Sequence, residues 1–230
     1  MPDLPDAAGR AVAVLVAALT RARGSKPMHP RGALFEAVLD RTGPARPWGV
    51  GWIDGRSVDR VVVRISRGAG LHGRWPDLLG LAIRLPAPPG GEPVDLLLTS
   101  AGRGPWSRLV PLPRRDAATA YCSIMSYGSP LGAVRFAALP DGPGVPSEPV
   151  ELARHVTRRG LGFTLAVALE HGAWEPIGRL RLLAAARPLD PDVHVDAVLH
   201  PPPGLTAGGP MARFRRPAYA AARRARGAGR

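Results

Sequence analysis

A histidine, an arginine and a serine are spaced so that they could share one polar pocket. His29 lies in the segment KPMHPRG, and Arg64 and Ser66 lie near the end of VVVRIS, residues 61–66. Residues two positions apart on a strand point to the same face, so Arg64 and Ser66 are predicted to face one way. An imidazole transfers protons near neutral pH, and a guanidinium binds carboxylates. We therefore predict a buried polar pocket, within the sheet, at which these three side chains converge.

Each of the three residues also has a simpler structural interpretation. His29 could cap the element that begins at Pro30, and Arg64 and Ser66 could face solvent from a strand. The remaining histidines show no metal-site pair at i, i+4 spacing, and they are His72, His155, His171, His194 and His200. The sequence lacks the G-x-S-x-G motif of hydrolases with a nucleophile elbow, so hydrolase chemistry finds little support.

Composition favours a globular protein and gives limited information about its partner. The 230 residues are 45% hydrophobic and carry a formal net charge of +13, nearly all of it from arginine. Because asparagine and glutamine are absent, we attribute much of this excess to base composition; the charge only weakly favours an anionic partner. Cys122 is the single cysteine, which excludes a disulfide framework. An acidic leader and an apolar run too short for a bilayer, residues 11–19, predict a cytoplasmic protein without membrane contact.

Two-residue periodicity dominates from residue 48 onward. It predicts strands at residues 48–53, 58–66, 78–85, 94–99, 131–139, 162–171, 177–184 and 193–200. The Asp54-Gly55 dipeptide should turn the first two strands into a hairpin. Seven or eight strands at this spacing favour a closed antiparallel barrel with room for one ligand.

Helical segments are predicted at the two ends of the chain. Residues 6–22 have helical spacing and end in arginines followed by glycine, which is a helix stop. We expect a single barrel domain over residues 1–210 that begins with this helix. Residues 211–230 form an Ala/Arg-rich helix or tail, which Pro217 interrupts.

An ordered series of short motifs resembles the catalase-like haem proteins, in particular their small single-barrel bacterial members. KPMHPRG resembles the distal-histidine segment of that family, and VVVRIS resembles the strand with its propionate-binding arginine and distal serine. RWPDLLGLAIRL, with Asp77 and Gly80, resembles the D-x-x-G-x-A segment that follows, and GEPVDLLLTS resembles the next strand. RRPAY with AARRAR resembles the proximal segment, in which an arginine four residues before a tyrosine supports the iron-binding phenolate.

The resemblance implies an α+β, mainly β fold, an eight-stranded antiparallel catalase-like barrel with flanking helices that binds haem b. It implies that His29 and Ser66 are catalytic and that Tyr219 binds the iron. It assigns contacts with the cofactor to Lys26, Arg64, Arg215, Tyr219 and Arg226. Peroxide and a small organic reductant are the expected partners.

The sequence departs from the family at the distal asparagine, because the chain contains none. Thr99 or Ser100 is the nearest substitute, and a hydroxyl lacks the two donors of an amide. We therefore expect peroxidase-like rather than strong catalase activity. Two alternatives stay open: a barrel that binds haem or another apolar ligand without turnover, and a basic protein that binds nucleic acid through its tail. A homo-oligomer also stays open.

Overall fold

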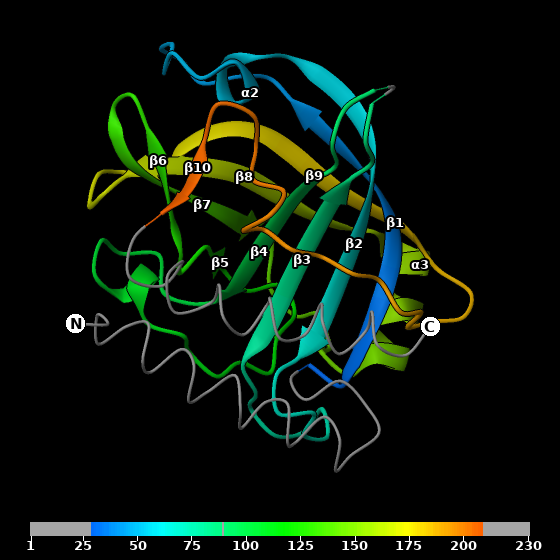
Figure 1. The fold of residues 1–230 in the computed structure, drawn as a ribbon. Coiled ribbons are helices and arrows are strands. Elements are labelled where there is room, and N and C mark those ends of the chain that lie inside the picture. Colours follow the sequence, from blue (N-terminus) through cyan, green and yellow to red (C-terminus); the bar gives the residue numbers. More distant parts are fainter. Residues whose placement is uncertain (1–28, 89, 209–230) are drawn as a thin grey trace, which may run out of the picture.

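A closed antiparallel barrel forms the centre of the computed structural model, which describes residues 29–88 and 90–208 (Figure 1). Its eight strands are β1 (Arg31–Arg41), β2 (Ser57–Arg67), β3 (Leu79–Leu85), β4 (Val94–Ser100), β5 (Tyr121–Cys122), β7 (Gly132–Pro140), β8 (Leu161–Leu169) and β9 (Glu175–Ala185). They follow the order β1-β2-β3-β4-β5-β7-β8-β9, and β9 pairs with β1 to close the ring. The predicted barrel is therefore confirmed. Two short strands, β6 (Ser126–Ser129) and β10 (Thr206–Gly208), extend the sheet beyond β7.

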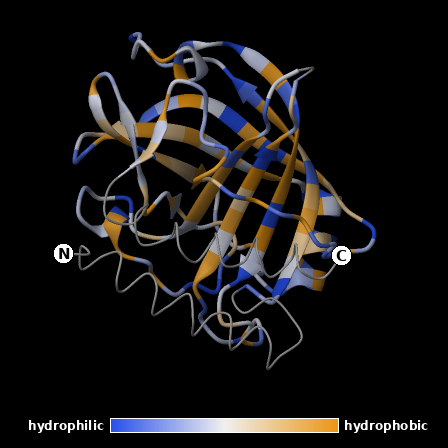
Figure 2. Cartoon of the chain, viewed as in Figure 1, coloured by the Kyte–Doolittle hydropathy of each residue, from blue (hydrophilic) through white to orange (hydrophobic). Residues whose placement is uncertain are grey.

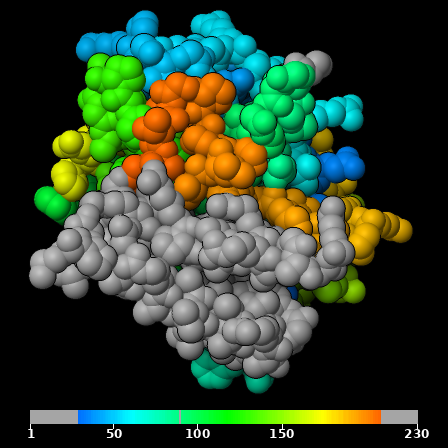
Figure 3. All heavy atoms as spheres, viewed as in Figure 1, coloured from blue at the N-terminus to red at the C-terminus, as the bar shows by residue number. Residues whose placement is uncertain are grey.

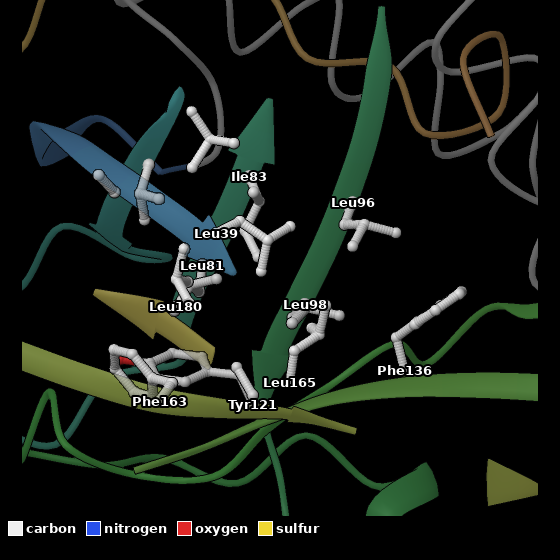
Figure 4. Close-up of a cluster of buried hydrophobic side chains, with 14 of the residues drawn as sticks. Leu39, Leu81, Ile83, Leu96, Leu98, Tyr121, Phe136, Phe163, Leu165 and Leu180 are labelled. Atoms are coloured by element: carbon white, nitrogen blue, oxygen red, sulfur yellow. The ribbon is translucent and has the colours of Figure 1, made fainter. Parts of the chain in front are cut away.

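Apolar side chains fill the interior of the barrel. Strand residues alternate between the two faces of the sheet, as the hydropathy colouring of Figure 2 shows. On β2 the inward row is Val61, Val63 and Ile65, which are 3%, 0% and 2% exposed. Figure 4 shows other members of this core gathered between the strands, among them Leu39, Leu81, Ile83, Leu96, Leu98, Phe163, Leu165 and Leu180. Each such side chain contributes roughly 1.5–3 kcal/mol through burial.

This packed interior corrects the prediction that the barrel has room for a ligand inside it. Side chains from opposite walls meet there, so the interior of the barrel is a packed hydrophobic core. Strand alternation places the polar residues of β2 on the other face. A ligand site that uses Arg64 and Ser66 has to lie on the outer wall.

The predicted first hairpin is wrong because its first strand is a helix. Residues Gly51–Asp54 form α2, and the carboxylate of Asp54 accepts hydrogen bonds from the backbone N–H groups of Trp48 (2.7 Å) and Val50 (3.1 Å). Such local bonds favour a turn over an extended strand. The partner of β2 is instead β1, which directly follows His29 and pairs from Arg31↔Arg67 to Arg41↔Ser57.

Other elements agree with the sequence more closely. The predicted pair formed by β3 and β4 is antiparallel, and β7, β8 and β9 lie within a few residues of their predicted positions. Besides α2, the sequence did not predict α3 (Pro149–Arg159), which starts with proline in its first turn and ends before Gly160 at φ 71°. None of the helices in the described part of the chain is long and apolar enough to cross a bilayer.

The strap, residues 186–205, replaces the strand predicted at 193–200. It connects β9 to β10 and crosses the outer face of β2 and β3 (Figure 1). Figure 3 shows parts of it at the molecular surface on the same face. Val193 and Val195 are half-buried and alternate with the polar residues His194 and Asp196. This alternation resembles that of a strand because the strap is extended, yet it packs across the face of the sheet instead of pairing at an edge.

Candidate functional site

The strongest candidate site is a pocket between the strap and the outer face of β2, β3 and β4. Its cavity is about 200 Å³ in volume, and its described lining residues are His29, Arg64, Ser66, Gly80, Leu81, Ala82, Leu97, Leu98, Thr99, Val193 and Val195. The sheet contributes mostly small or apolar residues to this wall, with the polar groups at one end. The pocket thus has apolar walls on the sheet and the strap, and an imidazole, a hydroxyl and a guanidinium are part of its lining.

His29 is held against the sheet by its backbone and by its ring. Its N–H donates to the carbonyl of Gly68 at 3.0 Å, and its ring Nδ1 lies 3.0 Å from Oγ of Ser66. The residue has a φ of 57°, which is uncommon for a residue with a side chain and is found disproportionately at functional sites. The hydrogen bond to Ser66 restricts the orientation of the ring at the pocket.

A glycine in β3 makes the position of this ring possible. A Cβ atom on Gly80 would lie 2.7 Å from Cε1 of His29 and 3.0 Å from Oγ of Ser66. Any larger residue would therefore push the imidazole off the sheet. This contact gives a physical reason for a glycine in the D-x-x-G-x-A motif.

Arg64 is paired with a carboxylate of the strap. Its Nε donates to Oδ1 of Asp190 at 2.7 Å, and its Nη2 donates to Oδ2 at 2.8 Å and to the carbonyl of His29 at 3.0 Å. The side chain of Arg64 is 9% exposed and that of Asp190 is 24% exposed. This is the bidentate geometry in which guanidinium groups bind carboxylates most strongly.

Further contacts fasten the strap on both sides of Asp190. The carbonyl of Leu189 accepts a hydrogen bond from the N–H of Leu34 at 2.8 Å in β1, and Nη1 of Arg84 in β3 donates to the carbonyl of His194. The N–H of Asp196 donates to Oδ2 of Asp95 in β4 at 2.8 Å. The strap is therefore tied to four neighbouring strands, since Arg64 belongs to β2.

Asp95 is an acid in an unfavourable environment. It is 0% exposed, and its Oδ1 has no hydrogen-bond partner within the described ranges. Burial raises the pKa of this carboxyl, while the hydrogen bond from the Asp196 N–H and the charge of Arg84 oppose the rise. One strap contact thus depends on a carboxyl that is costly to keep ionised.

The loop that leads to Gly80 is fixed by a buried arginine. Arg67 is fully buried, lies 3.8 Å from the carboxylate of Asp77, and donates to the carbonyls of Leu71 (2.7 Å) and Trp75 (2.6 Å). Asp77 in turn accepts hydrogen bonds from the N–H groups of Ala69 at 2.9 Å and Leu71 at 3.0 Å. Burial lowers the pKa of Arg67, and the nearby carboxylate of Asp77 offsets part of that effect. This network holds the loop whose Gly68 carbonyl binds His29.

The structure brings together three of the residues predicted for the site and leaves the others untested. His29, Arg64 and Ser66 all line the pocket, as does Thr99, whereas Ser100 is buried and donates to the carbonyl of Leu112 at 2.7 Å. Of these two hydroxyl residues, only Thr99 is among the described lining residues of the pocket. The remaining predicted residues lie outside the described residues: Lys26, Arg215, Tyr219 and Arg226.

Asp190 is the residue beside the candidate site that the sequence did not predict. It lies 126 positions from Arg64, and no motif in PLDPDVHVD marks it as the partner of an arginine. The alternation of Val193 and Val195 instead predicted an ordinary strand. Only the path of the strap over β2 reveals the pair.

Known structures share this architecture. A fungal catalase aligns with a TM-score of 0.55 at 14% identity, over 90% of this chain and 60% of its own. Catalase A from Saccharomyces cerevisiae aligns with a TM-score of 0.54 at 12% identity, over 90% of this chain and 63% of its own. The chain has a catalase-like fold.

These alignments establish the catalase-like fold and do not establish an activity. At such identities a structural likeness shows the fold alone, and this chain spans less than two thirds of either catalase. No protein-family model matches the sequence, and no curated protein matches it. The chemistry has to be argued from the pocket.

Proposed function

We propose that this catalase-like barrel binds haem b on its outer wall, in the pocket, and uses it for peroxidase-like chemistry. The observation that carries the proposal is the His29–Ser66 pair seated over Gly80 at the edge of that wall. An oriented imidazole beside a flat apolar surface suits proton transfer next to a planar macrocycle. The catalase-like fold supports the same assignment.

The chemistry of the described residues fits one face of a haem. Gly80 and Ala82 are small residues on the outer wall and Leu97 is apolar, so a planar apolar ring could lie against them. Arg64 would bind a propionate, together with Lys26. Tyr219 would bind the iron as a phenolate, and Arg215 would stabilise that anion. Arg226 would be a further contact with the cofactor.

The bound haem would supply the iron that passes two electrons from an organic reductant to peroxide. The reaction consumes two protons and yields two molecules of water from hydrogen peroxide. His29 would take a proton from one peroxide oxygen and return it to the departing one. Ser66 would keep the ring oriented. If Nδ1 carries the ring proton and donates to Ser66, then Nε2 is the basic nitrogen.

The test is to add ferric haem to the purified full-length protein. We expect a Soret band that shifts in Tyr219→Phe, and peroxide-dependent oxidation of a dye that is lost in His29→Ala. His72→Ala is the matched control, because His72 is an exposed histidine outside the pocket. A Soret band that stays identical to that of free haem when the wild type is added would refute the proposal.

Binding without turnover is the second candidate function. Arg64 is already neutralised by Asp190, and Thr99 takes the place of an amide. Both features would weaken a catalytic haem site more than a binding site. A Soret band that the wild type shifts from its position in free haem, without dye oxidation, would favour this alternative. Nucleic-acid binding through residues 211–230 remains a prediction, since the tail lies outside the described residues.

A further inference from the structure

Asp190 occupies the face of Arg64 that an acidic ligand would need. Two parallel hydrogen bonds, of 2.7 Å and 2.8 Å, join the carboxylate to Nε and Nη2 of the guanidinium. Nη2 also donates to the carbonyl of His29. A ligand carboxylate that is to bind the same edge of Arg64 has to replace Asp190.

The size of the pocket leads to the same conclusion. Its volume of about 200 Å³ is below the range of roughly 300–1,000 Å³ that is typical for drug-sized ligands. Val193 and Val195 of the strap form the wall opposite the sheet. A ligand as large as a macrocycle therefore needs the strap to move outward near Arg64.

The anchors of the strap limit where this movement can take place. The carbonyl of Leu189 is held by Leu34, and the carbonyl of His194 is held by Arg84. Between these two points lie residues 190–193, whose one side-chain ion pair to the sheet, among the described residues, is Asp190 with Arg64. Release of that pair would free a short segment without detaching the strap.

Building on the proposed function, we propose that Asp190 is an internal substitute for the ligand's carboxylate and makes the pocket selective for acidic ligands. A carboxylate-bearing ligand exchanges one ion pair on Arg64 for another, and the released Asp190 becomes hydrated. A ligand without a carboxylate has no group with which to displace Asp190, since the Arg64 charge would then be left buried and unpaired. Asp190 is thus a specificity-determining residue, and residues 190–193 are the segment that moves.

The test compares ferric haem with its dimethyl ester, which has the same ring and no carboxylate. Both are titrated against the wild type, Asp190→Asn and Asp192→Asn. The last variant removes the same charge from the same segment but leaves Arg64 paired, and Asp192 is 63% exposed. We expect the wild type to bind haem but not the ester. Asp190→Asn should tighten haem binding by about tenfold or more and should allow the ester to bind as well, because neither ligand then has to break an ion pair on Arg64, and Asp192→Asn should change neither.

Hydrogen exchange provides a second measurement that does not involve activity. In the wild type, haem should speed amide exchange within residues 190–193, and the ester should not. Binding of the ester to the wild type as tightly as haem, or no effect of Asp190→Asn on either ligand, would overturn the inference while leaving haem binding intact. If the wild type binds neither porphyrin, the proposed function fails and the inference fails with it.

Discussion

Nδ1 of His29 lies 3.0 Å from Oγ of Ser66, although 37 positions separate the two residues. The contact exists because β2 runs beside β3, where Gly80 leaves room for the ring. The backbone of His29 is bound separately, through the carbonyl of Gly68. Two independent contacts thus fix one imidazole at the edge of the pocket.

Gly80→Ala should displace the ring of His29. The new Cβ would lie 2.7 Å from Cε1 of the imidazole and 2.9 Å from Nδ1, and overpacking of this kind costs about 1–3 kcal/mol. We expect a shifted His29 ring signal by NMR and a lower free energy of unfolding in urea. Gly142→Ala is the control, because a Cβ there meets no atom within 4 Å. An unshifted His29 signal in Gly80→Ala would contradict the arrangement.

Asp77→Ala should destabilise the protein strongly. Arg67 is fully buried, and removal of one partner of a buried ion pair costs about 3–5 kcal/mol because the other charge is left uncompensated. The variant also loses the acceptor of the N–H groups of Ala69 and Leu71. Urea denaturation followed by tryptophan fluorescence measures the loss. Asp192→Ala, at an exposed acid, should change the unfolding free energy by less than about 0.5 kcal/mol.

Sequence patterns predicted the features of the fold that depend on neighbouring residues better than those that depend on contacts between distant ones. Alternation in β3, β4, β7 and β8 was readable because each strand has one face on the apolar core. The spacing of Arg64 and Ser66 placed them correctly on one face for the same reason. The expected ligand site inside the barrel was wrong, because the apolar row Val61, Val63 and Ile65 fills the interior and leaves Arg64 and Ser66 on the outer face.

Two further errors have equally physical causes. Residues predicted as a strand form α2 because the Asp54 carboxylate accepts hydrogen bonds from the N–H groups of Trp48 and Val50. Hydrophobic periodicity carries no information about such bonds. Apolar and polar residues alternate along the strap because one side of this extended segment packs on the sheet. Its pairing of Asp190 with Arg64 depends on the path of the chain across the barrel, which no local pattern contains.

Cys122 should be unreactive in the folded protein. The residue is 0% exposed, and burial raises the pKa of its thiol to about 12, although the charges of Arg108 and Arg103 oppose the rise. The thiolate is the reactive species, so almost none is present at about pH 8. We expect iodoacetamide to label the protein only after denaturation in concentrated urea, as mass spectrometry can show. Rapid labelling of the native protein would mean that the core around Cys122 opens readily.

Asp95→Asn should remove a pH-dependent cost to stability. Because burial raises the pKa of Asp95 in the folded protein, the native state binds more protons than the unfolded state at pH values between about 3.9 and that raised pKa. The contribution of this carboxyl to stability therefore falls as the pH rises through that window. The asparagine side chain keeps an oxygen that can accept the hydrogen bond from the N–H of Asp196 but does not ionise.

The measurement is the free energy of unfolding in urea for the wild type and Asp95→Asn at several pH values. The variant should gain stability relative to the wild type as the pH rises, because only the wild type has to keep a buried carboxylate with Oδ1 unpaired among the described residues. The difference should level off once Asp95 is fully ionised. A difference that stays constant with pH would show that this carboxyl titrates alike in both states, and a variant that loses stability with rising pH would show that the ion pair with Arg84 (3.4 Å) outweighs burial.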